Sequence, residues 1–180
     1  MKPLIREITI TAGIILSGCS LFQSSMLGAT LSDANVLAMF DIINLIEIDS
    51  SNLAQDKASS EDVKTFASIM LSEHTVMMQD TRQLAQQINV DPQTPVLAST
   101  VGKRHQETME ELRRISGADF DQAYLKYQIQ VHEQAIGLVE NTAEAVHDRR
   151  LQQYLKEARQ YLVIHLSAAN AIERNVVARY

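Results

Sequence analysis

The sequence predicts an all-α protein built as a four-helix bundle, and three observations support this prediction. Three prolines and six glycines in 180 residues leave few obligatory turns. Four long segments carry apolar residues at the three- and four-residue spacing that places them on one face of a helix. The length and the 46% of hydrophobic residues suit a single domain with a substantial core.

The first segment, residues 1–18, has the pattern of a bacterial signal peptide. A positively charged start precedes a short apolar run at 8–16 that is too short to span a bilayer. The run ends in Leu16-Ser17-Gly18-Cys19, which resembles the box at which bacterial lipoproteins are cleaved and lipidated on the cysteine. The alternatives are an ordinary signal peptide with an incidental cysteine, or a frayed helix in a cytosolic protein. Because Cys19 is the only cysteine, no internal disulfide is possible.

The residue after this cysteine indicates where the protein is sent. In bacterial lipoproteins serine at this position, here Ser20, implies export to the outer membrane. We therefore expect a cell-envelope lipoprotein that faces the periplasm, with residues 19–31 as a tether and 32–180 as the helical bundle. The acyl chains on Cys19 would anchor the protein in the membrane, and each buried methylene would contribute about 0.8 kcal/mol to the binding free energy.

Charge excludes one class of partner. The formal net charge is −6 and no basic stripe occurs, which argues against binding nucleic acid or an anionic lipid surface. The only partner that the sequence indicates is the membrane, through the lipidated cysteine. A protein partner and an oligomeric state are not indicated.

The first two helices are expected over 33–58 and 60–88. Ser32 and Asp33 are good N-cap residues for the first, and Ser59 and Asp62 have the spacing of a capping box for the second. The first helix is apolar on more than one face, so its rotation is not fixed; one face carries Val36, Phe40, Ile43, Glu47, Ser50 and Ala54. The second has one heptad face: Val63, Ala67, Met70, His74, Met77, Thr81, Leu84 and Ile88.

Three further helices follow a loop rich in turn-forming residues at 89–95. A short polar helix at about 95–115 is expected to end at Gly117, and Asp119 is expected to cap a long helix at 120–147. After a turn at His147-Asp148, the last helix spans about 149–178. The two long helices have nearly pure heptad faces with one histidine each, namely Leu125, Ile129, His132, Ile136, Val139, Ala143 and Val146, then Leu151, Leu155, Ala158, Leu162, His165, Ala169, Ile172 and Val176.

The order of these helices predicts the connectivity of the bundle. Four long helices, with the short one in the crossover between the second and the third, fit a ferritin-like four-helix bundle rather than a simple up-down-up-down arrangement. The tight connections then bring the midpoints of the long helices to similar heights.

Each long helix carries one residue able to bind a metal near its midpoint: Glu47, His74, His132 and His165. Counted from the connecting turns, the last two are level and the first two differ by about one helical turn, roughly 5 Å. Bundles build metal sites from side chains on facing helices. Three imidazoles and a carboxylate suit Zn, Fe, Mn or Cu. The sequence therefore predicts one transition-metal ion in the core, and no catalytic residue is assigned.

The same four residues could instead form a buried polar network that fixes the packing of the helices. The protein would then be a structural or partner-binding bundle without a metal. Met70, Met77 and Met78 flank the histidine of the second helix, and thioethers favour Cu(I), but such methionines are more often core filler. Four other polar residues are expected at the solvated surface: Glu73, Glu133, His105 and His147.

Several short segments carry a resemblance to a known family. They are Glu47-Ile48, Val63-Lys64, Phe66-Ala67, Glu73-His74, Gly117–Asp121, Val131-His132 and Leu162–Leu166. Over about residues 33–176 the chain resembles the bacterial ferritin-like family catalogued as domain of unknown function 4142. The resemblance implies a ferritin-like fold and an exported, often outer-membrane, location. It implies no reaction, because the biochemical role of the family is uncharacterised.

The wider ferritin-like superfamily suggests di-iron chemistry, and here the pattern departs from it. Di-iron bundles use Glu-x-x-His on two helices and a glutamate from each of the others. In this chain Leu71, Ile129 and Leu162 stand three residues before the three histidines, so the bridging carboxylates are missing. A redox enzyme is therefore the third hypothesis, after a metal-binding bundle and a structural bundle, and enzymatic activity is not favoured.

Overall fold

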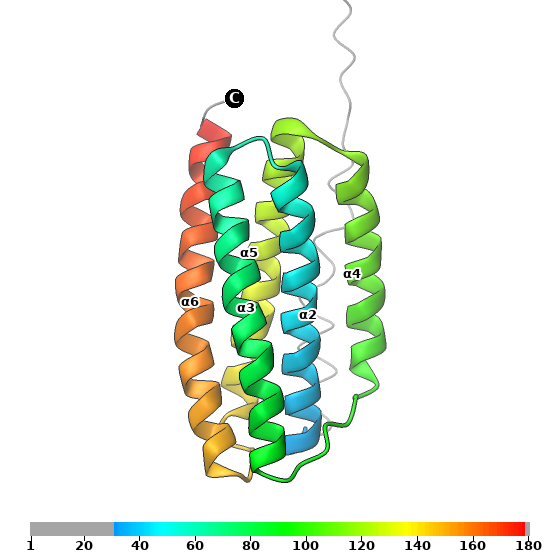
Figure 1. Ribbon diagram of the computed structural model, residues 1–180, viewed down its shortest axis with the longest axis vertical. Helices are drawn as coiled ribbons and strands as arrows, with labels where there is room; N and C mark the ends of the chain where they lie inside the picture. Colours follow the sequence, from blue (N-terminus) through cyan, green and yellow to red (C-terminus); the bar gives the residue numbers. More distant parts are fainter. Residues whose placement is uncertain (1–30, 179–180) are drawn as a thin grey trace, which may run out of the picture. The chain divides into compact units, whose positions relative to one another are not determined.

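A computed structural model describes residues 31–178 of the chain. Within that range the protein forms five α-helices and no strand (Figure 1): α2 (Asp33–Lys57), α3 (Glu61–Gln87), α4 (Leu97–Arg114), α5 (Gly117–Thr142) and α6 (Arg149–Ala178). The predicted all-α class with bundle-like packing is confirmed. Cys19, the predicted signal peptide and all but the last residue of the predicted tether lie outside the described residues.

Four of the helices enclose one core. Helix α2 packs against α3, α5 packs against α6, and the two pairs meet through α2 with α5 and α3 with α6. Helix α4 lies outside this group, against α2 and α5. It carries the chain back along the bundle, so that α3 and α5 run in the same direction while α2 and α6 run in the opposite one (Figure 1). No helix of the described part is long and apolar enough to cross a membrane.

An aromatic cluster forms part of the apolar core. The rings of Phe120 and Tyr124 stack with centroids 6.2 Å apart, and Phe66 meets Tyr124 edge to face at 6.4 Å. All three side chains are buried. Burying a large apolar side chain contributes roughly 1.5–3 kcal/mol, so we assign a stabilising role to this aromatic cluster, defined here as Phe66, Phe120 and Tyr124.

The start of α2 agrees with the sequence prediction. Ser32 is the N-cap; its hydroxyl accepts a hydrogen bond from the backbone N–H of Asn35 at 3.2 Å, and the Asn35 side-chain oxygen accepts one from the Ser32 N–H at 3.4 Å. This reciprocal pair satisfies two of the amide groups that the first turn leaves without intrahelical partners.

The start of α3 is capped differently from the prediction. The N-cap is Ser60 rather than Ser59, and its side chain makes no capping bond. Instead the carboxylate of Asp121, on α5, accepts hydrogen bonds from the backbone N–H groups of Ser59 and Ser60 at 2.9 and 2.8 Å and from the Ser59 hydroxyl at 2.6 Å. A carboxylate is favourable at a helix N-terminus, so this tertiary contact fixes α3 against α5.

The limits of α5 also differ from the prediction. The helix begins at Gly117, with Ser116 rather than Asp119 as its N-cap, and Gly117 has a φ of 65° that glycine adopts without strain. It ends at Thr142, five residues before the expected end. The following turn is held by Asp33, which accepts hydrogen bonds from the backbone N–H groups of His147 and Asp148 at 2.8 and 2.9 Å.

Candidate metal centre

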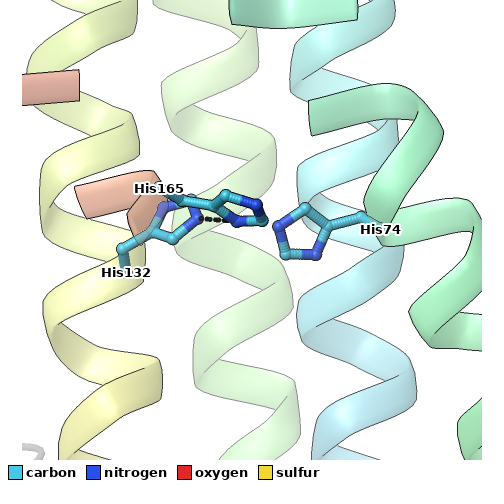
Figure 2. A group of neighbouring side chains, drawn as sticks. All are labelled: His74, His132 and His165. Carbon is cyan, nitrogen blue, oxygen red and sulfur yellow. Dashed lines mark hydrogen bonds between the residues drawn. The ribbon is translucent and has the colours of Figure 1, made fainter. Parts of the chain in front are cut away.

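Three histidines from three helices meet in the core of the bundle (Figure 2). His74 comes from α3, His132 from α5 and His165 from α6, and their exposed fractions are 0%, 0% and 2%. One ligand nitrogen from each residue lies within 4.8 Å of the others. The ring centroids are 5.3 to 5.6 Å apart. These residues are called the three-histidine centre below.

The heptad pattern explains why the three rings point inward. Met70 and Met77, four residues before and three after His74, are both buried, so the histidine lies on the core face of α3. On α6 the residues at the same spacing around His165, Leu162 and Ala169, are also buried. These positions therefore place the rings of both histidines in the packed core of the bundle.

Each ring is held from outside by one hydrogen-bond acceptor. His74 Nδ1–H donates to the side-chain oxygen of Asn44 at 2.9 Å, and His132 Nδ1–H donates to the backbone carbonyl of Gln128 at 2.8 Å. His165 Nε2–H donates to the carboxylate of Glu73 at 2.6 Å. Because all three partners are oxygen acceptors, each of these ring nitrogens carries the proton.

The other nitrogen of each ring then presents a lone pair to the centre. Nε2 of His132 and Nδ1 of His165 are 3.3 Å apart, and neither retains a proton to donate to the other. Nε2 of His74 is buried and has no hydrogen-bond partner in the described part of the chain. A buried polar atom left unpaired costs about 1–3 kcal/mol. Two nitrogens bound tetrahedrally to one Zn²⁺ at 2.0–2.1 Å would be about 3.3 Å apart, which matches the measured separation.

Burial keeps the three rings uncharged. It lowers the pKa of His132 to about 4, partly offset by the bond to the Gln128 carbonyl. The pKa of His74 falls well below its ordinary value, first through burial and then through the neighbouring histidines. For His165 burial also lowers the pKa, while Glu73 acts in the opposite direction. Neutral imidazole is the form that binds a metal ion.

Glu47, the fourth residue that the sequence predicted for the site, lies beside this group and is not part of it. Its carboxyl is fully buried, and one oxygen is 3.6 Å from Nδ1 of His132, the nitrogen that faces away from the centre. Neither oxygen has a hydrogen-bond partner among residues 31–178. Burial raises the pKa of Glu47 to about 8, with the nearby Gln128 side chain acting in the opposite direction. Burial therefore makes the carboxyl retain its proton to a higher pH than an ordinary glutamate does.

Two residues expected at the surface make contacts that the sequence did not predict. Glu73 lies on a solvated flank, as expected, with 42% of its side chain exposed, and it also reaches across to α6 and accepts a hydrogen bond from the His165 ring. His105 was expected at the surface of α4, but its side chain is only 15% exposed and its ring bonds to the Tyr127 hydroxyl at 2.8 Å and to Asp49 at 3.0 Å. Both side chains bridge two helices, which a residue-by-residue reading of one helix does not reveal. Glu133 and His147 are exposed, as expected.

The outer partners Asn44 and Gln128 were not anticipated. Asn44 stands three residues before Glu47, and Gln128 stands four before His132. Each is thus one helical turn from a residue that the sequence singled out, and that spacing is the signal that could have found them.

Comparison with known proteins identifies the family and the fold. Residues 22–172 match the profile of a family described as Domain of unknown function (DUF4142). No protein with curated annotation matches the sequence. A candidate secreted protein, DUF305, from Streptomyces coelicolor has a similar structure, with a TM-score of 0.69 and 10% identity over 80% of this chain and 93% of that one.

CopM is a second structural neighbour. Its Cu(II)-bound form has a TM-score of 0.64 and 13% identity, covering 81% of this chain and 98% of CopM. Its Ag-bound form, obtained by soaking, has a TM-score of 0.65 and 12% identity, covering 82% and 98%. At such low identity these similarities establish the helical fold alone.

Proposed function

This chain belongs to the DUF4142 family, whose description names no activity, and from its three-histidine centre we propose that it binds a single transition-metal ion in the core of the bundle. One observation carries the proposal: three buried nitrogens with lone pairs converge, while the opposite nitrogen of each ring is occupied by an acceptor. Metal-binding histidines characteristically donate their second N–H to a carboxylate, a carbonyl or water, and all three rings here donate to an oxygen acceptor.

The donor set favours zinc or copper among the four metals that the sequence indicated. Imidazole suits Zn, Cu and Fe, whereas Mn prefers the carboxylate oxygens that this group of three lacks, and nitrogen sites generally bind Cu and Zn more tightly than Fe. CopM, which shares the fold at low identity, is known with Cu(II) and with Ag bound, and this supports testing copper first. Glu47, beside His132, would lie next to the ligands and would not be one of them.

We further propose that the bundle is ferritin-like and works in the cell envelope, anchored to the outer membrane by lipidated Cys19. The box that ends in Cys19 supports the anchor. The similarity to a candidate secreted protein supports export, and the crossover along α4 supports the ferritin-like connectivity. Metabolic labelling with a fatty acid tests the anchor: the wild type should incorporate the label and Cys19→Ser should not.

A structural bundle is the second candidate. Three rings that each hold an outer partner could also serve to fix the register of α3, α5 and α6 without any ion. The two candidates differ in one measurable respect, because only the first predicts stoichiometric metal.

Metal analysis therefore decides between them. The protein is purified without chelator, offered Zn, Cu, Fe and Mn separately, and analysed for bound metal and melting temperature. We expect one ion of Zn or Cu per chain and a higher melting temperature, since a ligand at 100 times its Kd stabilises by about 2.7 kcal/mol.

Variants then assign the bound ion to the centre. His132→Ala and His165→Ala should each lose the ion and remain helical by circular dichroism. His147→Ala, at an exposed position outside the centre, should keep it. A wild type that takes up none of the four metals and melts at an unchanged temperature would favour the structural bundle.

A further inference from the structure

We propose that Glu73, between α3 and α6, is the solvent-side gate of the three-histidine centre: it receives the incoming cation and orients His165 toward it. The inference rests on the proposed function, because it concerns the same ion. It assigns a role to a residue outside the predicted ligand set.

The outer partners of the three rings differ in their access to water. The side chain of Asn44 is buried with 1% exposed, and Gln128 is fully buried. The side chain of Glu73 is 42% exposed, although its carboxylate is only 2.6 Å from Nε2 of His165. Among the hydrogen-bond partners of the rings, Glu73 is therefore the one that connects the centre to solvent.

The chemistry of Glu73 suits this position. A half-exposed carboxylate attracts cations, and it can exchange between His165 and water at small cost because solvent reaches it. The ion would meet this oxygen first and then pass to Nδ1 of His165, which faces the other two rings. His165 keeps its Nε2–H throughout, so the transfer needs no proton movement on the ring.

The same contact fixes the tautomer of His165. As long as Nε2–H donates to the carboxylate, Nδ1 is the nitrogen with the lone pair. In the other two rings Nδ1–H donates to an oxygen acceptor, so His165 alone should carry its proton on Nε2. Without the hydrogen bond to Glu73, the His165 ring is no longer held in the orientation that points Nδ1 at the centre.

Two substitutions separate the charge from the hydrogen bond. Glu73→Gln keeps an acceptor oxygen for Nε2–H and removes the charge, so the association rate should fall by about tenfold and lose its dependence on salt. Glu73→Ala removes both, so the affinity should fall by 10- to 100-fold as well. Glu133→Gln is the matched control, since Glu133 also adjoins a histidine of the centre but is exposed on α5.

The measurements use the full mature chain, with circular dichroism to verify folding. Competition with a chromophoric chelator gives the Kd for Zn(II) and for Cu(I), and stopped-flow mixing gives the association rate at two salt concentrations. Nitrogen-15 NMR of the metal-free protein gives the tautomers. We expect Nε2–H at His165 and Nδ1–H at the other two rings in the wild type, with the His165 pattern lost only in Glu73→Ala.

The outcomes distinguish the gate from the binding site. If the wild type binds an ion but both Glu73 variants match Glu133→Gln in rate, affinity and tautomer, the gate is overturned and the metal site stands. If the wild type binds neither ion, the proposed function fails and the gate fails with it. A slowed Glu73→Gln with a retained tautomer supports the proposal.

Discussion

The aromatic cluster and the three-histidine centre are both buried parts of one bundle, but they differ in whether their polar atoms have hydrogen-bond partners. In the aromatic cluster the one polar atom, the Tyr124 hydroxyl, shares a hydrogen bond with Ser51 at 3.2 Å. Around the three-histidine centre, buried atoms of His74, Glu47, Asn44 and Gln128 have no partner in the described chain. We therefore expect the first region to stabilise the fold, and the unpaired polar atoms of the second to lower the stability of the metal-free protein.

The largest expected effect comes from breaking the stabilising region. Phe120→Ala removes a fully buried ring that stacks on Tyr124, and large-to-small changes at such sites cost about 3–5 kcal/mol. Urea unfolding should show this loss. Because the substitution does not touch the three-histidine centre, the folded variant should still bind one ion per chain. A variant as stable as the wild type would contradict our assignment of stability to the aromatic cluster.

The next largest effect is the pH-dependent loss of stability that the buried carboxyl of Glu47 causes. Its pKa is raised by burial to about 8 in the folded protein, against about 4.5 for an ordinary glutamate. The folded state therefore holds a proton that the unfolded state releases between these values, and stability is lost as the pH rises from about 4.5 to about 8.

Glu47→Gln removes this titration from the metal-free protein. At pH 9 the variant should be more stable than the wild type by about 3 kcal/mol, less than the full shift implies because water can reach an ionised buried carboxylate. At pH 4.5 the two should agree within about 1 kcal/mol, since Glu47 is then protonated in the folded state and still about half protonated in the unfolded state, so little of the loss has developed. Denaturant titrations at both pH values measure the difference; equal stability at pH 9 would show that Glu47 is not buried as a neutral acid.

The smallest expected effect tests how much the buried polar side chains of the three-histidine centre contribute to stability. In the double variant Asn44→Leu/His74→Leu, two hydrogen-bonding partners are replaced together by apolar side chains. Removing both partners of a buried bond is nearly neutral or stabilising, so the metal-free variant should equal the wild type or exceed it by about 1 kcal/mol. It should bind no metal. A double variant that unfolds at much lower denaturant concentration would indicate that the polar layer itself holds the bundle together.

The sequence was sufficient to predict the fold class and the three histidines. His74 and His165 lie between buried apolar residues on their heptad faces, as the periodicity predicts. On α5 the buried neighbours of His132 are Gln128 and Ala135, while the predicted Ile129 and Ile136 are only partly buried. The level placement of His132 and His165 followed from counting along two antiparallel helices joined by a short turn. These inferences need only the repeat of one helix and the length of one connection.

The outer partners could not be predicted in the same way. Helix α2 is apolar on several faces, so its rotation, and with it the position of Asn44 and Glu47, depends on tertiary packing. Glu73 lies next to His74 in the sequence, about 100° around the helix, and its role appears only because α6 passes there. The cap of α3 likewise comes from Asp121, which lies about 60 residues away and on another helix.

The crossover along α4 has a consequence for the donor atoms themselves. Helical side chains lean toward the N-terminus of their own helix, so His74 and His132, on helices of the same direction, lean one way and His165 leans the other. The nitrogens they offer divide in the same manner, Nε2 from the first two and Nδ1 from the third. A bundle with the same residues but alternating helix directions would tilt these three rings differently, so the path of the crossover along α4 affects the orientation of side chains in the core.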